Sequence, residues 1–510
     1  MKTMERILIL DCGSQYTQLI ARKIREMGIY SEILPWDAAA ERVLALAPKG
    51  IILSGYARSV LQKGAPVIHE AILKASIPVL GIGYGMALIA HQLGGRVEAG
   101  TSSAYGLQEV SLEKPSPLFE NAPASIDVWM NDQDRVLALP SGASVTAKTQ
   151  EGHIAAFSLS EGAIYGVCFH PEVSQTQGGE EILSAFVRGV CKCTGEWKLE
   201  PWVKQTIADI KAKVGSDHVV AGLSGGVDST VSAVLTARAI GKQLDCIFVD
   251  HGFLRKGEVQ QVLETYKQLD LQVHFVDATE TFAKALKGVT DPEQKRKIIG
   301  ELFVRVFEAE AEKLGGADWL LQGTIYPDVI ESGTSANEVI KSHHNVGGLP
   351  EDMDMKLLEP LRELFKDEVK KIGAVLGIPA SFLERHPFPG PGLAVRCLGE
   401  LKKDRLDTLR EADAIFVEEI KKAGLYAKVW QAFCVLIPTR SVGVSGDSRT
   451  YGETVALRAV SSVDAMTAQW VRLPWDLIDT VSHRICTEVP GVGRVVFDVS
   501  NKPPATIEWE

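Results

Sequence analysis

The sequence predicts an α/β protein with several domains, and three observations support this expectation. Apolar runs of strand length alternate with helical segments near residues 5–93 and again near 218–276, which is typical of doubly wound parallel sheets. The length of 510 residues is enough for several hydrophobic cores. Hydrophobic residues make up 45% of the chain and charged residues 23%, as in ordinary globular proteins.

Composition also excludes some classes of function. A net charge of −11 argues against an extended nucleic-acid surface, although a local basic pocket for one phosphorylated ligand remains compatible with it. No apolar run reaches transmembrane length, and the first residues lack the apolar core of a signal peptide. The eight cysteines have no zinc-site spacing, which indicates reduced thiols. We therefore expect a cytoplasmic protein without a membrane or nucleic-acid partner.

The first predicted domain covers residues 1–196, and a linker rich in Lys, Gly, Glu and Pro follows it near 192–201. Strands are expected at 5–12, near 50–55 and at 77–80, and a more β-like stretch ends at 163–172. The turn 81–85 joins a strand to a helix over 86–93. It lacks the Gly-x-Gly-x-x-Gly spacing of a dinucleotide site, but it has the geometry of a nucleophile elbow. Gly83 would occupy the apex, where it has no side chain to attack with.

The second predicted domain, 202–385, begins with a glycine-rich loop between a strand at 218–223 and a helix at 230–240. Such a loop exposes backbone amides to a phosphate, and the helix N-terminus adds favourable partial charge. It has no Gly-Lys-Ser/Thr ending, so hydroxyls and amides would hold ATP, and Asp228 would be available to Mg²⁺. A plain capped helix is the alternative reading. The predicted ATP-binding residues are Ser224, Gly225, Gly226, Val227, Asp228, Ser229 and, at the end of the next strand, Val249.

The third predicted domain, 386–510, starts in a segment rich in Pro and Gly at 385–393. It mixes helices at 403–423 and 464–469 with strands at 433–437, 455–460 and 494–498, which indicates a small α+β domain. Its last residues are apolar and stiffened by proline. We expect this tail to be docked rather than frayed.

The loop Ser224–Ser229 resembles the ATP pyrophosphatases, the first domain resembles the class I glutamine amidotransferases, and the whole chain resembles the bacterial GMP synthetases. The amidotransferase family carries a Cys-His-Glu triad, with Cys in a Gly-Ile-Cys-Tyr-Gly-Met-Gln run. This chain keeps His170 and Glu172 but has Gly83 at the position of the nucleophile. The fold class is thus a class I amidotransferase doubly wound domain, an ATP-pyrophosphatase Rossmann-like domain and an α+β dimerisation domain.

Other departures fall in the same pocket. Ala87 stands where the family has Gln after Met. The family's Ser-Gly-Gly-Pro strand corresponds to Ser54-Gly55-Tyr56-Ala57 in this chain. Its Ser-His-Gly-Asp run corresponds to Asn-Asp-Gln-Asp at residues 131–134. Since an acyl-enzyme needs a thiolate, these changes predict an inactive glutaminase with a residual His170–Glu172 dyad. The alternative is that Cys12 or Cys168 serves as a substitute nucleophile. For both residues we favour a role in core packing over this alternative.

The resemblance further implies a lid at 341–350 and purine-nucleotide contacts. These contacts would come from Arg305, Gln431, Lys502, Ile507 and Glu508. The reaction it implies is ATP- and Mg²⁺-dependent adenylation of xanthosine 5'-monophosphate, followed by displacement of AMP by ammonia to give GMP. Ammonia would be free or supplied by a separate amidotransferase, and a homodimer is expected.

Two alternatives to this function remain open from the sequence. One is a related adenylating ligase that uses another nucleophile or purine nucleotide. The other is a non-catalytic nucleotide-binding paralogue.

Overall fold

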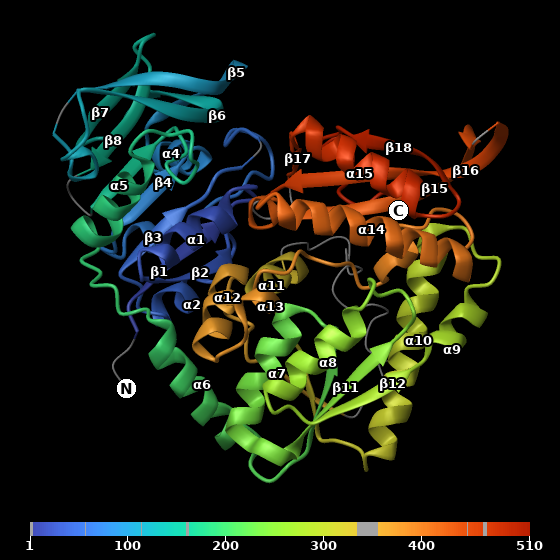
Figure 1. Cartoon of the computed structure of the whole chain (residues 1–510). Helices are drawn as coiled ribbons and strands as arrows, with labels where there is room; N and C mark the ends of the chain where they lie inside the picture. Colours follow the sequence, from blue (N-terminus) through green and yellow to red (C-terminus); the bar gives the residue numbers. More distant parts are fainter. Residues whose placement is uncertain are drawn as a thin grey trace. The chain divides into compact units, whose positions relative to one another are not determined.

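The computed structural model describes residues 4–56, 58–113, 115–159, 163–333, 355–445, 447–462 and 467–510. The chain divides into two compact units, Met1–Trp202 and Val203–Glu510 (Figure 1). Among the described residues the first unit holds one large sheet and the second holds two smaller ones. None of the helices in these ranges is long and apolar enough to cross a membrane.

The sheet of the first unit joins a parallel half to an antiparallel half. Its strands follow the order β2-β1-β3-β4-β9-β8-β7-β5-β6; neighbours are parallel from β2 to β9 and antiparallel beyond it. The strands are β1 Arg6–Asp11, β2 Tyr30–Pro35, β3 Gly50–Leu53, β4 Val79–Ile82, β5 Arg96–Leu112, β6 Ser125–Ala138, β7 Ala143–Thr149, β8 Ile154–Leu159 and β9 Ile164–Val167. The helices are α1 Thr17–Glu26, α2 Ala40–Ala45, α3 Glu70–Leu73, α4 Tyr84–Gln92 and α5 Gly179–Ser184.

Close backbone packing fixes α4 against the parallel half of this sheet. A Cβ atom on Gly81 would lie 2.5 Å from the carbonyl carbon of Gly85, and one on Gly85 would lie 2.4 Å from the carbonyl oxygen of Leu53. Only glycine fits at these positions. The start of α4 is therefore held at the carboxyl edge of β3 and β4.

The second unit opens with a parallel five-stranded sheet in the order β12-β11-β10-β13-β14. The strand order reverses beside β10, and ligands bind at such switch points in open α/β sheets. The strands are β10 Val219–Leu223, β11 Leu244–Asp250, β12 Val273–Asp277, β13 Trp319–Leu321 and β14 Lys356–Leu358. The helices are α6 Leu199–Val214, α7 Val227–Ile240, α8 Glu258–Gln268, α9 Thr279–Ala285, α10 Pro292–Lys313, α11 Tyr326–Gly333, α12 Lys366–Val375 and α13 Ala380–Leu383.

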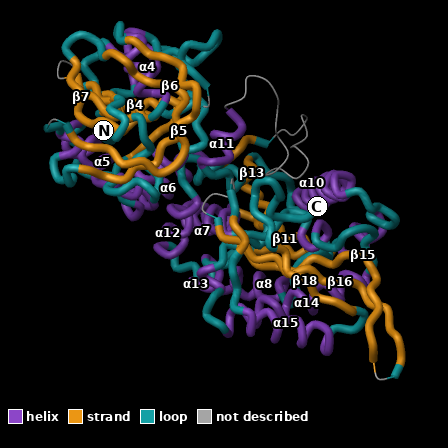
Figure 2. Tube along the Cα trace, turned by 90° about the horizontal axis from the view of Figure 1, so that it is seen from above, coloured by secondary structure: helices purple, strands orange, loops and turns teal. Residues whose placement is uncertain are grey.

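The remaining sheet of the second unit is mixed and is covered by two helices. β15 pairs antiparallel with β16, which also pairs with β17 and, in parallel, with β18. The outer part of the β15–β16 hairpin extends away from the rest of this sheet (Figure 2). The elements are α14 Lys403–Lys422, β15 Gln431–Ser445, β16 Ser448–Ser461, β17 Gln469–Trp470, α15 Trp475–Glu488 and β18 Val492–Asp498.

The sequence prediction of an α/β protein with an α+β C-terminal part is confirmed, but one predicted helix is wrong. Gln469 was assigned to a helix over 464–469, whereas it lies in β17 and pairs with Ser461. The helix of this region is α15, whose buried residues Leu477, Val481 and Ile485 are four residues apart. Residues 463–466 and the predicted lid at 341–350 lie outside the described residues.

Candidate functional site

Gly83 lies at the apex of the turn between β4 and α4. Its φ and ψ are 57° and −116°, a conformation that costs a residue with a side chain free energy but costs glycine little. The Gly83 amide donates to the carbonyl of Val167 on β9 at 2.8 Å. The turn thus has the backbone conformation of an elbow, and the residue at its apex carries no nucleophile.

His170 and Glu172 form a buried pair after β9. His170 Nδ1 donates to Glu172 Oε1 at 2.7 Å, and both residues are almost inaccessible to solvent. The Tyr16 ring packs edge-on against the imidazole, with 4.8 Å between ring centroids. A Cβ atom on Gly55 would lie 3.7 Å from His170 Cε1, so the segment after β3 passes beside this ring. The dyad predicted from the sequence is assembled.

The altered pocket residues surround this dyad and the elbow. Tyr56 packs edge-on against Tyr84, with 5.3 Å between ring centroids, and its Cδ2 lies 3.1 Å from where a Cβ on Gly13 would be. Asp134 accepts a hydrogen bond from the Val60 amide at 2.7 Å, and Ala87 is buried in α4. Ala57 and the side chains of 132 and 133 lie outside the described residues.

The two cysteines considered as substitutes differ in exposure. Cys12 is 2% exposed, and burial, with Asp11 beside it, raises the pKa of its thiol far above the ordinary value. Its Sγ lies 4.0 Å from the carbonyl of Leu10. Cys168 is partly buried and packs against the core of the sheet. Cys12 is therefore a poor source of thiolate.

The glycine-rich loop lies between β10 and α7, at the switch point of the second unit. Gly225 has a positive φ of 75°, and Ser224 Oγ accepts a hydrogen bond from the Gly226 amide at 3.3 Å. The Ser224 and Ser229 hydroxyls lie 3.2 Å apart. A Cβ on Gly323 would approach Ser229 N to 3.0 Å, so the segment after β13 adjoins the loop. The loop has the hydroxyls and helix N-terminus of an anion cradle.

Asp228 in this loop is paired with a cation that the sequence analysis missed. Lys366 Nζ, at the first residue of α12, lies 2.5 Å from Asp228 Oδ2. Asp228 Oδ1 is shielded from solvent and has no hydrogen-bond partner among the described residues. On the other side of the loop, Arg385 Nη1 donates to the Gly225 carbonyl at 3.3 Å and Arg385 also pairs with Glu258.

Two other sequence predictions concern the end of β11. Val249 is buried there, and the pKa of the neighbouring Asp250 carboxyl is raised by burial. Two cations follow this strand end. Arg255 Nε lies 3.4 Å from Asp413, and Lys256 Nζ lies 2.6 Å from Glu411.

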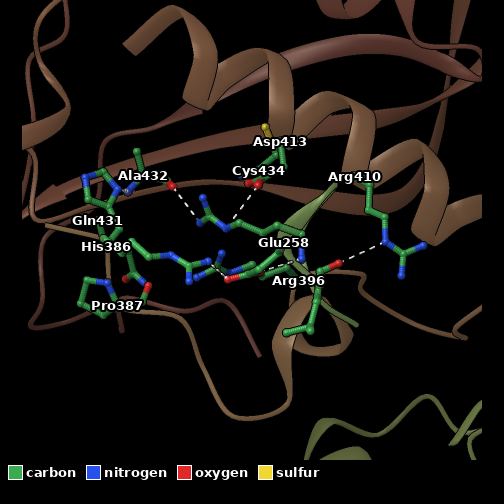
Figure 3. A network of polar contacts seen from close by, with 12 residues as sticks. Glu258, His386, Pro387, Arg396, Arg410, Asp413, Gln431, Ala432 and Cys434 are labelled. Atoms are coloured by element: carbon green, nitrogen blue, oxygen red, sulfur yellow. Dashed lines mark hydrogen bonds and ion pairs between the residues drawn. The ribbon is translucent and has the colours of Figure 1, made fainter. Parts of the chain in front are cut away.

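A second polar cluster joins the C-terminal tail to the segment before α14. Arg396 is fully buried and donates through Nε and Nη2 to the two carboxylate oxygens of Glu508, at 2.9 and 2.8 Å. Gln431 Nε2 donates to Glu508 Oε1 at 3.1 Å and to the Pro387 carbonyl at 2.9 Å. Arg396, Gln431 and Pro387 are labelled in the polar network of Figure 3. Arg396 Nη1 and Gln431 Oε1 are buried without a partner among the described residues.

The other predicted nucleotide contacts are more dispersed. Ile507 is buried in an apolar cluster beneath β15 and β16, and the Lys502 backbone pairs with Ala468. Arg305 is exposed on α10. The residues of α10 that bond to the tail are Lys295 and Arg296, both through Glu510. Arg305 is thus not among the α10 cations that hold the tail.

Comparisons with known proteins follow the same division of the chain. Family models match residues 8–190 (glutamine amidotransferase class-I), 198–305 (NAD synthase) and 418–509 (GMP synthase C terminal domain). GMP synthase (glutamine-hydrolyzing) of Aquifex aeolicus (strain VF5) is 54% identical over 505 residues, which is 99% of both chains. This chain belongs to that family. Relatives of the same name from Caldicellulosiruptor saccharolyticus and Carboxydothermus hydrogenoformans are 53% and 54% identical, also over 99% of both chains.

Family membership directs attention to the elbow at Gly83. The GMP synthases that the chain resembles are named for glutamine hydrolysis. The dyad that would activate a thiol is intact, whereas the residue at the apex cannot attack. The site in the first unit can orient a proton acceptor but can form no acyl-enzyme at residue 83.

Proposed function

We propose that this chain aminates xanthosine 5'-monophosphate to GMP with ATP and ammonia, and that it does not hydrolyse glutamine. The proposal rests on a contrast between the glycine-rich loop of the second unit and the elbow of the first unit. The loop Ser224–Ser229 keeps every residue expected of an ATP pyrophosphatase at a switch point, whereas Gly83 leaves the elbow without a nucleophile. An adenylating enzyme without its own glutaminase is the simplest function that fits both.

The adenylation step needs positioning and charge neutralisation rather than a covalent intermediate. In our proposal the C2 oxygen of the xanthine attacks the α-phosphorus of ATP, and pyrophosphate leaves. The amides of Gly225 and Gly226 and the hydroxyls of Ser224 and Ser229 would hold the phosphates. Ammonia would then attack C2, and AMP would leave with the C2 oxygen.

Magnesium fits the residues around the loop. Asp228 offers a carboxylate oxygen that is shielded and has no partner among the described residues, which is the hard ligand that Mg²⁺ prefers. When bound, the ion would neutralise charge on the leaving pyrophosphate. We assign Asp228 to this ion, together with the phosphate oxygens.

The xanthosine monophosphate would be bound near the tail. Gln431 and Glu508 are hydrogen-bonded to each other. Gln431 Oε1 and Arg396 Nη1, both buried without a partner among the described residues, would supply one acceptor and one donor if the site opens to the nucleotide. We keep Lys502 and Ile507 as contacts and add Arg396, and we regard Arg305 as the weakest member of the set. The three-domain division, the homodimer and the cytoplasmic location belong to the same proposal.

The nitrogen would come from free ammonia or from a separate amidotransferase. Burial makes Cys12 unsuited to replace the nucleophile, since a thiolate there would lose its hydration. Cys168 is less buried, and it would still need an oxyanion site in a pocket where Tyr56 and Ala87 differ from the family.

Exchange of labelled pyrophosphate into ATP tests the adenylation half. We expect exchange that requires both Mg²⁺ and xanthosine monophosphate, and at least a hundredfold loss in the Asp228→Asn variant. Exchange with another purine nucleotide only would favour the related ligase. No exchange with any purine nucleotide would contradict the proposal and favour a binding paralogue.

A further inference from the structure

The peptide group between Gly225 and Gly226 has its two polar atoms on opposite sides of the glycine-rich loop. A trans peptide is planar, so its carbonyl and its N–H point in opposite directions. The Gly225 carbonyl accepts a hydrogen bond from Arg385 Nη1 at 3.3 Å. The Gly226 amide donates to Ser224 Oγ at 3.3 Å, and that hydroxyl lies 3.2 Å from the Ser229 hydroxyl. The amide thus faces the hydroxyls of the anion cradle, and the carbonyl faces away from them.

This peptide group lies in a part of the loop whose backbone can rotate readily. It is flanked by two glycines, with a φ of 75° at Gly225 and of −82° at Gly226. Since glycine tolerates both signs of φ, a rotation of the group by about 180° meets little steric resistance. That rotation would bring the partial negative charge of the carbonyl oxygen against a bound phosphate. An anion cradle built on this loop therefore needs a contact that fixes the peptide group.

Arg385 is held in place by contacts outside the loop. It pairs with Glu258, the first residue of α8, which is 8% exposed and is labelled in Figure 3. The other carboxylate oxygen of Glu258 accepts a hydrogen bond from the Arg255 amide at 2.9 Å, so the carboxylate itself is fixed to the backbone. The Arg385 guanidinium also lies 5.2 Å from the centre of the Phe382 ring. Its planar fork therefore presents a donor to the Gly225 carbonyl from a fixed position.

We propose that Arg385 is a positioning residue of the ATP site: by holding the Gly225 carbonyl, it keeps the Gly226 amide directed at the phosphates of ATP. Arg385 acts through this peptide group and does not itself contact the nucleotide. Glu258 orients Arg385 and so supports the same arrangement. This inference rests on the ATP chemistry of the proposed function.

Binding of magnesium pyrophosphate to the full chain, measured by titration calorimetry without ATP, purine nucleotide or nitrogen donor, tests the inference. Arg385→Met should weaken binding at least about tenfold, because the peptide group can then rotate. Arg385→Lys keeps a donor for the carbonyl and should stay within about threefold of the parent. Arg238→Met is the matched control, since Arg238 also donates to a backbone carbonyl, that of Leu376, but lies at the end of α7 remote from the loop. It should bind as the parent does.

Ionic strength separates this role from a simple effect of positive charge. An effect of the Arg385 charge through space is screened by salt, whereas the orientation of a peptide group is not. The ratio between the dissociation constants of Arg385→Met and of the parent should therefore stay within about twofold between about 0.1 M and about 1 M KCl. A ratio that falls to about one at the higher concentration would overturn the proposal.

Loss of Arg385 alone leaves the buried Glu258 carboxylate without its cation, which destabilises the fold. The double variant Arg385→Met/Glu258→Gln removes that charge. It should bind pyrophosphate as weakly as Arg385→Met and should melt near the temperature of the parent. If both variants bind pyrophosphate with the affinity of the parent, the inference fails and the proposed function stands. A parent that binds no pyrophosphate would instead contradict the proposed ATP site, and this inference with it.

Discussion

Gly83 leaves the apex of the β4–α4 turn without a side chain, while the residues around it are packed and buried. The His170–Glu172 pair remains bonded at 2.7 Å and shielded, although no thiol is present at the apex for it to activate. The changes at Tyr56 and Ala87 lie in the same pocket. A thiol at residue 83 alone should therefore not restore glutamine hydrolysis.

We predict that Gly83→Cys does not recover glutamine-dependent activity. Glutamate release should stay below about 1% of the ammonium-driven rate, because the oxyanion segment is altered too. A side chain at this φ should also lower the free energy of unfolding by about 1–3 kcal/mol. Gly83→Ala is the control for that backbone cost. Glutamate release at a rate comparable to GMP formation would show that the pocket is still competent.

His251 provides a residue-scale prediction about pH. Burial and the nearby Arg410 lower the pKa of its imidazole to about 4, and its Nδ1 accepts a hydrogen bond from the Phe253 amide at 3.1 Å. The unfolded chain, with a pKa of about 6.5, binds this proton more readily. Neutral His251 therefore contributes its full share to the free energy of unfolding above about pH 6.5. This contribution is lost as the pH falls from about 6.5 toward 4.

Urea unfolding at several pH values checks this. His251→Asn keeps an acceptor for Phe253, and between pH 6 and 5 its stability should fall less steeply than that of the parent, by up to about 1.4 kcal/mol per pH unit. Equal slopes for the two proteins would show that His251 does not titrate in this range.

Among the elements, the C-terminal tail depends on buried cations of earlier segments. Lys295 of α10 is fully buried, and its Nζ donates to the carbonyl of Cys397 at 3.0 Å and to Glu510 Oε2 at 2.5 Å. Arg458 of β16, also fully buried, donates to the carbonyls of Ser500 and Thr506. The expectation of a docked tail agrees with these contacts.

We predict that Lys295→Met lowers the free energy of unfolding of the second unit by about 3–5 kcal/mol, because it removes the cation that pairs with the Glu510 carboxylate and the donor to the Ala394 and Cys397 carbonyls. Lys313→Met on the same helix is the control: Lys313 is exposed and pairs with Glu310, so its removal should cost less than about 1 kcal/mol. Thermal unfolding of both variants measures the difference. Similar melting temperatures for the two would contradict the buried anchor.

Local elements were predictable from the sequence, and contacts between distant segments were not. The loop Ser224–Ser229 follows a strand of apolar residues, and its glycines are adjacent, so pattern alone places it. Lys366 and Arg396 meet their partners across 138 and 112 residues, and no spacing rule connects them. A basic residue at the start of the helix after the last parallel strand was the available signal for Lys366. The sequence also gives no sign that Lys256 forms an ion pair with Glu411, which lies 155 residues away.

At the scale of the molecule, the chain combines a segment that matches the NAD synthase family model with an amidotransferase-like segment that has Gly83 at its strand–helix elbow. Family membership is shown by relatives that are 53% and 54% identical over 99% of the chain. The central claim is that nitrogen reaches the second unit as ammonia that the first unit does not make. The nitrogen donor is therefore the property to measure.

The most direct measurement supplies ATP, Mg²⁺ and xanthosine monophosphate with glutamine labelled by ¹⁵N at the amide and with unlabelled ammonium, and follows the mass of the GMP formed. We predict unlabelled GMP, and no GMP when glutamine is the sole donor. GMP that carries ¹⁵N, in protein free of other amidotransferases, would contradict the account and would direct attention to Cys168 and Cys12.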